Sequence, residues 1–139
     1  MEKLKLVLTR GLPASGKSTF SKEWVNVDPK KRVRVSRDDI RNMLGPYWVP
    51  TREDLVTKIE NDMIENALGN GYSVIVDATN FRGTKRFEDM TKVYKTEFDV
   101  IDFTHVPLET CIERDKWRLV GKVGEDVIRK MHDKYLKDE

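Results

Sequence analysis

One loop near the start of the chain combines the residue types and the spacing that bind nucleotide phosphates. The segment Gly11-Leu12-Pro13-Ala14-Ser15-Gly16-Lys17-Ser18 matches the pattern G-x-x-x-x-G-K-[ST] in full. Its glycines let backbone N–H groups turn toward phosphate oxygens, Lys17 would bridge the β- and γ-phosphates, and the Ser18 hydroxyl would ligate Mg²⁺. The loop alone leaves hydrolysis, phosphoryl transfer and nucleotide sensing open. The residues that we expect to bind a nucleoside triphosphate here are Gly11, Ser15, Gly16, Lys17, Ser18 and Thr19.

A second polar segment, Ser36-Arg37-Asp38-Asp39-Ile40-Arg41, follows a short predicted strand. In a parallel α/β sheet, a loop at the carboxyl end of a strand borders the ligand crevice. A kinase needs a carboxylate that accepts the proton of the attacking hydroxyl, and a cation that holds an anionic acceptor in line. We assign Asp38 as this base and Arg41 as this clamp. The alternative is an acidic helix cap with a solvated i, i+3 ion pair between Asp38 and Arg41.

An aspartate closes the most continuous strand candidate, Ser73-Val74-Ile75-Val76. Asp77 is placed like a Walker B aspartate, which holds Mg²⁺ directly or through water. It is therefore a candidate metal ligand together with Ser18, and a candidate substrate contact together with Asn80. Two alternatives remain: Asp77 could orient Thr79, Asn80 or the base, or it could belong to a plain strand-terminating turn.

Two arginines late in the chain, Arg114 and Arg118, precede Gly121 and Gly124. In a helix they would share one face, and they could close over the nucleotide as a lid that neutralises charge on the transferring phosphoryl group. Arg118 is the preferred lid residue. The alternative is the solvated basic face of an amphipathic helix.

Two aromatic residues, Tyr47 and Trp48, occupy a loop that contains glycine and proline. They could stack a base of the acceptor, as aromatic side chains do in proteins that bind single strands. Packing against the sheet is the alternative.

Strand and helix patterns alternate along the chain around these residues. This alternation predicts an α/β fold with a central parallel sheet covered by helices on both faces. The longest helix should bury Leu55, Ile59, Met63 and Ala67, which are spaced by four. At 139 residues, we expect a single domain over 1–139. The predicted strands are 4–9, 33–35, 73–76 and 98–103, and the predicted helices are 17–25, 38–44, 52–68, 84–94, 108–120 and 125–136.

The composition limits the partners and the compartment. Lys and Arg number 26 against 24 Asp and Glu, so the formal charge of +2 gives no global drive toward nucleic acid or membrane. Cys111 is the only cysteine, which excludes an internal disulfide and a cysteine-built zinc site. No apolar run approaches ~20 residues, and the start lacks a signal-type stretch. We expect a soluble, cytoplasmic protein without a membrane partner.

Four of these segments together resemble those of a known family. The chain is similar to the kinase domain of bacteriophage-type 5′-hydroxyl polynucleotide kinase, within the P-loop kinase superfamily. The resemblance implies ATP-dependent phosphorylation, with Mg²⁺, of the 5′-hydroxyl ends of DNA or RNA in a bacterial or phage-infected cytosol. It also implies the fold of a P-loop NTPase similar to adenylate kinase, with a lid. The segments that carry it, in order and at compatible spacing, are residues 11–19, 36–41, 76–80 and 114–118.

The resemblance further implies roles for single residues. Lys17, Asp38 and Arg118 would be catalytic, with Asp38 as the general base and Arg118 as the lid arginine on the donor phosphates. Arg41 would contact the 3′-phosphate of the acceptor. Asp77 matches an essential acid whose role the resemblance does not assign.

Two features depart from the phage pattern. Ala14 occupies a position where that family usually has glycine, and no Asp-x-Asp-Gly-Thr phosphatase motif is present. The resemblance therefore implies a stand-alone kinase or an excised domain. Two other functions stay open, namely a P-loop kinase acting on a nucleoside, a sugar or an antibiotic, and a non-catalytic nucleotide-binding module. The second would not need a base, a clamp and a lid together.

Overall fold

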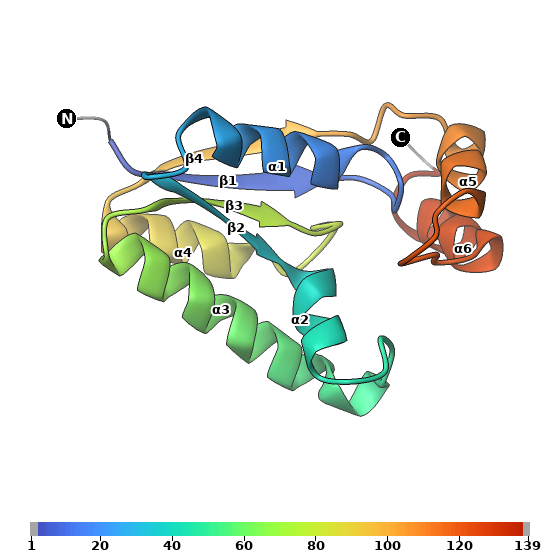
Figure 1. The fold of residues 1–139 in the computed structure, drawn as a ribbon, viewed down its shortest axis with the longest axis horizontal. Coiled ribbons are helices and arrows are strands. Elements are labelled where there is room, and N and C mark those ends of the chain that lie inside the picture. Colours follow the sequence, from blue (N-terminus) through green and yellow to red (C-terminus); the bar gives the residue numbers. More distant parts are fainter. Residues whose placement is uncertain (1–2, 138–139) are drawn as a thin grey trace.

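Four parallel strands form the centre of the fold in the computed structural model, which describes residues 3–137 (Figure 1). They are β1 (Lys5–Arg10), β2 (Arg32–Ser36), β3 (Ser73–Asp77) and β4 (Glu97–Asp102), in the spatial order β2-β3-β1-β4. The predicted α/β fold with a central parallel sheet is confirmed. The helices are α1 (Lys17–Val27), α2 (Arg37–Met43), the short 3-10 helix η1 (Pro50–Arg52), α3 (Glu53–Gly69), α4 (Lys85–Tyr94), α5 (Leu108–Lys116) and α6 (Glu125–Tyr135).

The two central strands, β1 and β3, are buried on both faces of the sheet. Leu6 pairs with Val74 and Leu8 pairs with Val76, and all four side chains are buried. Strands that are covered on both faces have continuous apolar sequences, which is why the sequence pattern located β1 and β3. The edge strand β4 is mostly exposed, so the sheet is covered on both faces at its centre and not along this edge.

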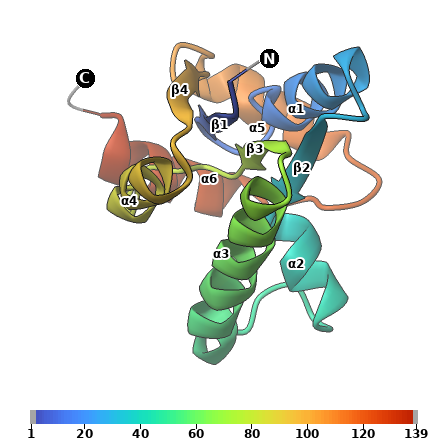
Figure 2. The same cartoon turned by 90° about the vertical axis from the view of Figure 1, so that its left-hand side faces the viewer.

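Helices lie on both sides of the sheet. The helix α1 packs against β1, β2 and β3 on one face, and α3 and α4 lie on the other (Figure 1, Figure 2). The larger apolar core fills the space between the sheet and the helices α3 and α4, together with Ile40 of α2. Its buried members are Leu6, Leu8, Val35, Ile40, Val56, Ile64, Leu68, Val74, Val76, Phe87 and Met90.

The buried side of α3 is shifted by one residue from the predicted side. Of the predicted residues, Leu55 and Met63 are exposed, while Ile59 and Ala67 pack only at the edge of the core. The reason is Glu60, because a search for apolar spacing leaves a carboxylate out of the buried side. Glu60 is nevertheless fully buried, since two arginines pair with it. The buried residues, also spaced by four, are Val56, Glu60, Ile64 and Leu68.

The helices α5 and α6 pack against each other beyond the carboxyl ends of the strands (Figure 1). The helix α5 ends at Lys116, and not at residue 120 as the sequence pattern predicted. The other boundaries lie within about two residues of the predicted ones. No helix among residues 3–137 is both long enough and apolar enough to cross a membrane. A second buried cluster joins these helices to the phosphate-binding loop and consists of Leu12, Cys111, Ile112, Ile128 and Leu136.

Candidate active site

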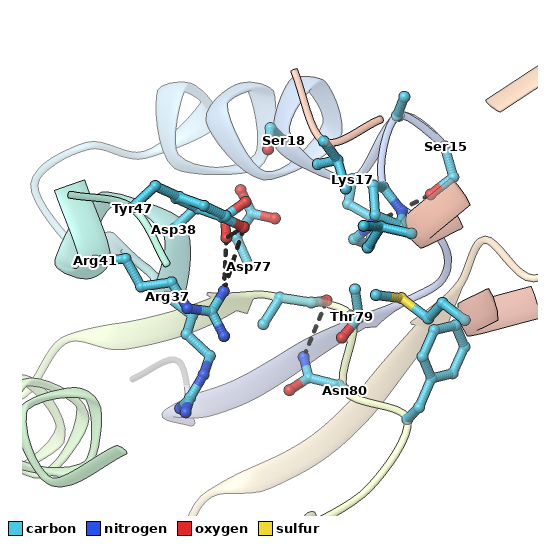
Figure 3. Close-up of a pocket in the computed structure, with 18 of the residues that line it drawn as sticks. Ser15, Lys17, Ser18, Arg37, Asp38, Arg41, Tyr47, Asp77, Thr79 and Asn80 are labelled. Carbon is cyan, nitrogen blue, oxygen red and sulfur yellow. Dashed lines mark hydrogen bonds and ion pairs between the residues drawn. The ribbon is translucent and has the colours of Figure 1, made fainter. Parts of the chain in front are cut away.

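A cavity of about 1440 Å³ lies at the carboxyl ends of β1, β2 and β3. Its lining comes from the loop at residues 11–18 (the P-loop), from the segments after β2 and β3, and from the connection between α5 and α6 (Figure 3). Pockets for one small ligand usually measure about 300–1,000 Å³, so this cavity has room for a nucleotide and a second ligand. The predicted site residues that line it are Ser15, Gly16, Lys17, Ser18, Thr19, Asp38, Arg41, Asp77, Asn80, Arg114 and Arg118.

The P-loop connects the end of β1 to the start of α1. Gly16 caps α1 with a φ of 107°, and Ala14 has a φ of 63°, so both lie in the left-handed region that favours glycine. Of the predicted residues, Gly11 is the one that lies outside the cavity lining. Its N–H donates to the Thr79 carbonyl over 3.1 Å, and a Cβ at this position would lie 2.8 Å from Cβ of Phe103. Gly11 therefore allows the end of β1 to pack closely against its neighbours.

Lys17 lies in the first turn of α1 and is only 7% exposed. Its ammonium donates to the Leu12 carbonyl over 2.5 Å and to the Ser15 hydroxyl over 3.4 Å. Burial lowers the pKa of Lys17 to about 8, although the negative charges of Asp77 and Asp38 act in the opposite direction. A bound anion close to a poorly solvated lysine favours the charged form of that lysine.

Asp38 and Arg41 form an ion pair within α2, with 2.9 Å between Asp38 Oδ1 and Arg41 Nη1. The cap of α2 is another residue, Ser36, whose hydroxyl accepts from the N–H of Asp39. The ion pair between Asp38 and Arg41, which the alternative to a catalytic role predicted, is thus present, but neither residue caps the helix. Both of its members also line the cavity, so the pair faces the same space as the P-loop (Figure 3).

Glu53, at the start of α3, holds the Arg41 guanidinium with two hydrogen bonds. Arg41 Nε donates to Glu53 Oε2 over 3.1 Å, and Nη2 donates to Oε1 over 2.6 Å. The hydrogen bonds from Arg41 lower the pKa of Glu53. Burial alone would lower the pKa of Arg41, but the Glu53 hydrogen bond and the neighbouring negative charges outweigh it and raise that pKa. Both groups stay ionised, so the clamp has a fixed orientation. No local sequence pattern indicated Glu53.

Tyr47 and Trp48 lie over Arg41 at the cavity and not against the sheet. The Arg41 guanidinium carbon lies 5.5 Å from the ring centre of Tyr47 and 5.6 Å from that of Trp48. The Tyr47 hydroxyl donates to Asp38 Oδ1 over 2.8 Å. Both rings line the cavity, where stacking on an acceptor base stays a prediction.

Asp77, the last residue of β3, is buried and pairs with Arg34 of β2. Both contacts between Arg34 and Asp77 are made with Oδ2 of the aspartate. The Ser18 hydroxyl and the Asp77 carboxylate line the same cavity and are hard oxygen donors. This donor set fits Mg²⁺, which is usually held by one or two protein oxygens together with waters and substrate phosphates.

Asn80 turns the chain after β3, with a φ of 49° that asparagine tolerates better than most residues. Its amide nitrogen donates to the Thr9 carbonyl over 2.7 Å. The Asn80 side chain thus ties the end of β3 to β1, and contact with substrate stays a prediction.

The two predicted lid arginines both line the cavity, but they do not share a helix face. Arg114 is in α5, whereas Arg118 follows the end of that helix, where the chain turns back. The turn is made by Asp115, which is buried and which the sequence did not single out as functional. Its two carboxylate oxygens accept from the N–H groups of Val123 and Gly124, each over 2.8 Å. Asp115 also lies 3.8 Å from the Arg118 guanidinium.

Glu60 of α3 is a second buried carboxylate that no sequence pattern indicated. Its Oε1 pairs with Arg37 over 3.1 Å and with Arg86 over 2.6 Å, and both arginines line the cavity. Glu60 Oε2 is buried without a hydrogen-bond partner among residues 3–137. This carboxylate links α2, α3 and α4 at the edge of the site.

Comparisons with known proteins add to this geometry. A family model described as AAA domain matches residues 6–137. The chain is 33% identical over 135 residues to the L-seryl-tRNA(Sec) kinase of Methanococcus maripaludis. This match covers 94% of this chain and 52% of that protein. A chain in the structure of the Pnkp1/Rnl/Hen1 RNA repair complex matches with a TM-score of 0.76 and 28% identity, over 99% of this chain and 46% of that one.

A further structural match shows the fold alone. The Mycobacterium tuberculosis APS kinase CysC, in complex with AMPPNP and APS, matches with a TM-score of 0.64 and 18% identity, over 88% of this chain and 75% of that one. The chain spans about half the length of the curated relative and of the RNA repair chain. The family model, in contrast, covers nearly all of this chain. The chain therefore belongs to this AAA-domain family, and it has the fold of a P-loop kinase.

Proposed function

We propose that this protein is a polynucleotide 5′-hydroxyl kinase that transfers the γ-phosphate of ATP to 5′-hydroxyl ends of DNA or RNA. The observation that carries the proposal is the ion pair between Asp38 and Arg41, which faces the same cavity as the P-loop. A base next to a cation suits an acceptor that carries a hydroxyl and a phosphate of its own. We also propose that residues 1–139 form one domain.

The donor half of the site would bind the phosphates of ATP. The backbone N–H groups of the P-loop and the start of α1 offer positive partial charge, and Lys17 adds a full charge. A Mg²⁺ ion held by Ser18 and Asp77 would neutralise charge on the phosphates when it is bound. Arg114 and Arg118 line the cavity from the lid side and would stabilise charge on the transferring phosphoryl group.

The acceptor half would be formed by α2. Asp38 would accept the proton of the 5′-hydroxyl as the oxygen attacks the γ-phosphorus. Arg41 would hold the phosphate on the 3′ side of the same nucleotide. Glu53 already holds Nε and Nη2 of Arg41. The remaining nitrogen, Nη1, donates to Asp38 and is the one best placed to donate to an acceptor phosphate instead.

The comparisons support an acceptor linked to RNA. The structural relative belongs to a complex described as an RNA repair complex, and the curated relative is named as a kinase of L-seryl-tRNA(Sec). The second name favours one further candidate, in which the hydroxyl belongs to a serine attached to tRNA. The identity of 33% over nearly the whole chain is the observation behind this candidate.

A panel of acceptors separates these candidates and the small-molecule kinase. It consists of a nucleoside, a nucleoside 3′-monophosphate, 5′-hydroxyl DNA and RNA oligonucleotides, and seryl-tRNA, each with γ-labelled ATP. We expect label on the oligonucleotides and on the nucleoside 3′-monophosphate, and hardly any on the bare nucleoside, because only the former offer Arg41 a phosphate. Label on the bare nucleoside alone, or on seryl-tRNA alone, would replace the proposal with the corresponding candidate.

A further inference from the structure

Three arginines of the cavity wall form a continuous row that is linked by two glutamates. Arg41 and Arg37 both donate to Glu53 Oε1, over 2.6 and 3.4 Å. Arg37 and Arg86 both donate to Glu60 Oε1, over 3.1 and 2.6 Å. All three arginines line the cavity, and Figure 3 shows Arg37 and Arg41 next to each other on α2. The row therefore leads from α2, which carries Arg41, to α4, which carries Arg86.

Arg86 is held in one orientation and keeps N–H donors for a ligand. Its Nε donates to the Gly83 carbonyl, Nη1 donates to Asn61 Oδ1, and Nη2 donates to Glu60. The guanidinium carbon also lies 4.2 Å from the ring centre of the buried Phe87. A guanidinium has five N–H donors, so two donors of Arg86 have no acceptor among residues 3–137. The side chain is 25% exposed and lines the cavity, which is where a ligand would meet them.

Arg37 and Thr57 add further donors beside Arg86. Arg37 makes all its hydrogen bonds with Nη1 and Nη2, so its Nε has no acceptor within the described part of the chain. The Thr57 hydroxyl accepts from Arg37 Nη2 over 2.8 Å, and its own proton remains available for another acceptor. Both side chains line the cavity. Fixed guanidinium groups next to a hydroxyl donor are a combination that suits a phosphate.

Glu60 fixes two of these arginines without neutralising the row. Its side chain is fully buried, and one carboxylate oxygen serves both arginines. Glu53 and Glu60 together balance two of the three positive charges, and the exposed Asp38 pairs with Arg41. Apolar side chains could join the three helices at lower cost, because burying charged groups requires their desolvation. Two cations around one carboxylate at a cavity wall instead suit the binding of a further anion.

We propose, on the basis of the proposed function, that Arg37 and Arg86 bind the second phosphate of the acceptor. In the proposed function, Arg41 holds the phosphate on the 3′ side of the first nucleotide. The next phosphate of the strand lies at the neighbouring guanidinium groups, with Thr57 as a further donor. The strand thus follows the cavity wall from α2 toward α4. This second subsite favours an acceptor with two or more phosphates over a nucleoside 3′-monophosphate.

The test compares two 5′-hydroxyl acceptors that differ by one phosphate, namely a dinucleoside monophosphate and the same dinucleotide with a 3′-phosphate. Both offer a phosphate to Arg41, and only the second acceptor offers one to Arg37 and Arg86. A hydrogen bond to a charged group corresponds to about tenfold, so the wild-type KM should be about tenfold lower for the second acceptor. Arg86→Met should bring the two KM values together. Arg129→Met is the matched control and should keep the difference, because Arg129 also pairs with glutamates but does not line the cavity.

Arg86→Met takes one cation from the buried Glu60, so thermal unfolding shows whether the variant folds. If it does not, Arg86→Lys decides the question, since lysine keeps a positive charge beside Glu60 but lacks the planar fork and should lose most of the difference in KM.

Three results would overturn the second subsite. They are equal KM values in the wild type, a full difference that survives replacement of Arg86, and a difference that is lost in Arg82→Met but kept in Arg86→Met. Arg82 also lines the cavity, so the last result would move the subsite there. In each of these cases the wild type still transfers phosphate. Failure of the proposed function would instead appear as absent transfer to both acceptors, which would also remove the basis of the subsite.

Discussion

Arg34 and Asp77 join the ends of β2 and β3 through an ion pair of 2.7 Å between Arg34 Nη2 and Asp77 Oδ2. The strand register makes the two residues diagonal neighbours on the same face of the sheet. Arg34 also pairs over 2.9 Å with the exposed Asp39 in the first turn of α2. One arginine thus fixes the carboxylate at the end of β3 relative to the helix that carries the proposed base.

Replacement of Arg34 should destabilise the protein strongly. Arg34→Met would leave the buried Asp77 carboxylate without its cation, and breaking a buried pair from one side costs about 3–5 kcal/mol. Urea denaturation measures the change in the free energy of unfolding. Lys85→Met is the matched control, since its pair with Asp89 is exposed and should contribute less than ~0.5 kcal/mol. Equal effects of the two substitutions would show that Arg34 does not neutralise Asp77.

ATP binding should weaken as the pH rises above about 8. Burial lowers the pKa of Lys17 to about 8 in the free protein. The phosphates of ATP favour the charged lysine, so its pKa is higher in the complex. Below this pH the lysine is protonated in both states and affinity is highest. Above it, binding must take up a proton, and the Kd should rise by up to about tenfold per pH unit until the pKa of the complex is reached.

Calorimetry between about pH 7 and pH 9.5 measures this dependence, and buffers with different ionisation enthalpies report the proton uptake. Lys17→Met should bind ATP more weakly than the wild type at every pH, and its Kd should not rise further above about pH 8. A wild-type Kd that stays flat over this range would exclude Lys17 as the source of the linkage.

Much of the donor half of the site was predictable because its signals are local. The P-loop pattern lies between a buried strand and a helix, and the segments after β2 and β3 meet at one edge of a parallel sheet. Chain order and strand direction alone bring Lys17, Asp38 and Asp77 to one cavity. The roles assigned to these residues stay predictions.

The partners of these residues were not predictable, because tertiary packing selects them. Glu53 and Tyr47 reach Arg41 and Asp38 across a loop, and no periodicity encodes such contacts. In α3, the apolar pattern gave a stripe shifted by one residue, since the pairing that buries Glu60 involves residues of other helices. Likewise, α5 is shorter than its pattern because the chain turns back onto a buried carboxylate.

That carboxylate, Asp115, should control the position of the lid. In Asp115→Asn, one of the two acceptor oxygens becomes an NH₂ group that faces a backbone N–H, either that of Val123 or that of Gly124. We expect the kcat for phosphoryl transfer to fall about tenfold, the equivalent of one hydrogen bond of ~1.4 kcal/mol, with hydrogen exchange faster across residues 117–124. Asp126→Asn, an exposed acid in the first turn of α6, is the control and should change neither quantity. If Asp115→Asn lowers kcat but leaves hydrogen exchange across residues 117–124 unchanged, Asp115 does not act by positioning the lid.

The most direct test of the account is transfer of label from γ-labelled ATP to a 5′-hydroxyl oligonucleotide by the wild type, Asp38→Ala and Asp39→Ala. The two aspartates are neighbours on α2, but only Asp38 lines the cavity, while Asp39 pairs with Arg34. We expect that the wild type and Asp39→Ala label the 5′ end, and that Asp38→Ala is slower by about 10²–10⁴-fold. A wild type that labels no DNA or RNA end, or an Asp38→Ala variant as active as Asp39→Ala, would contradict it.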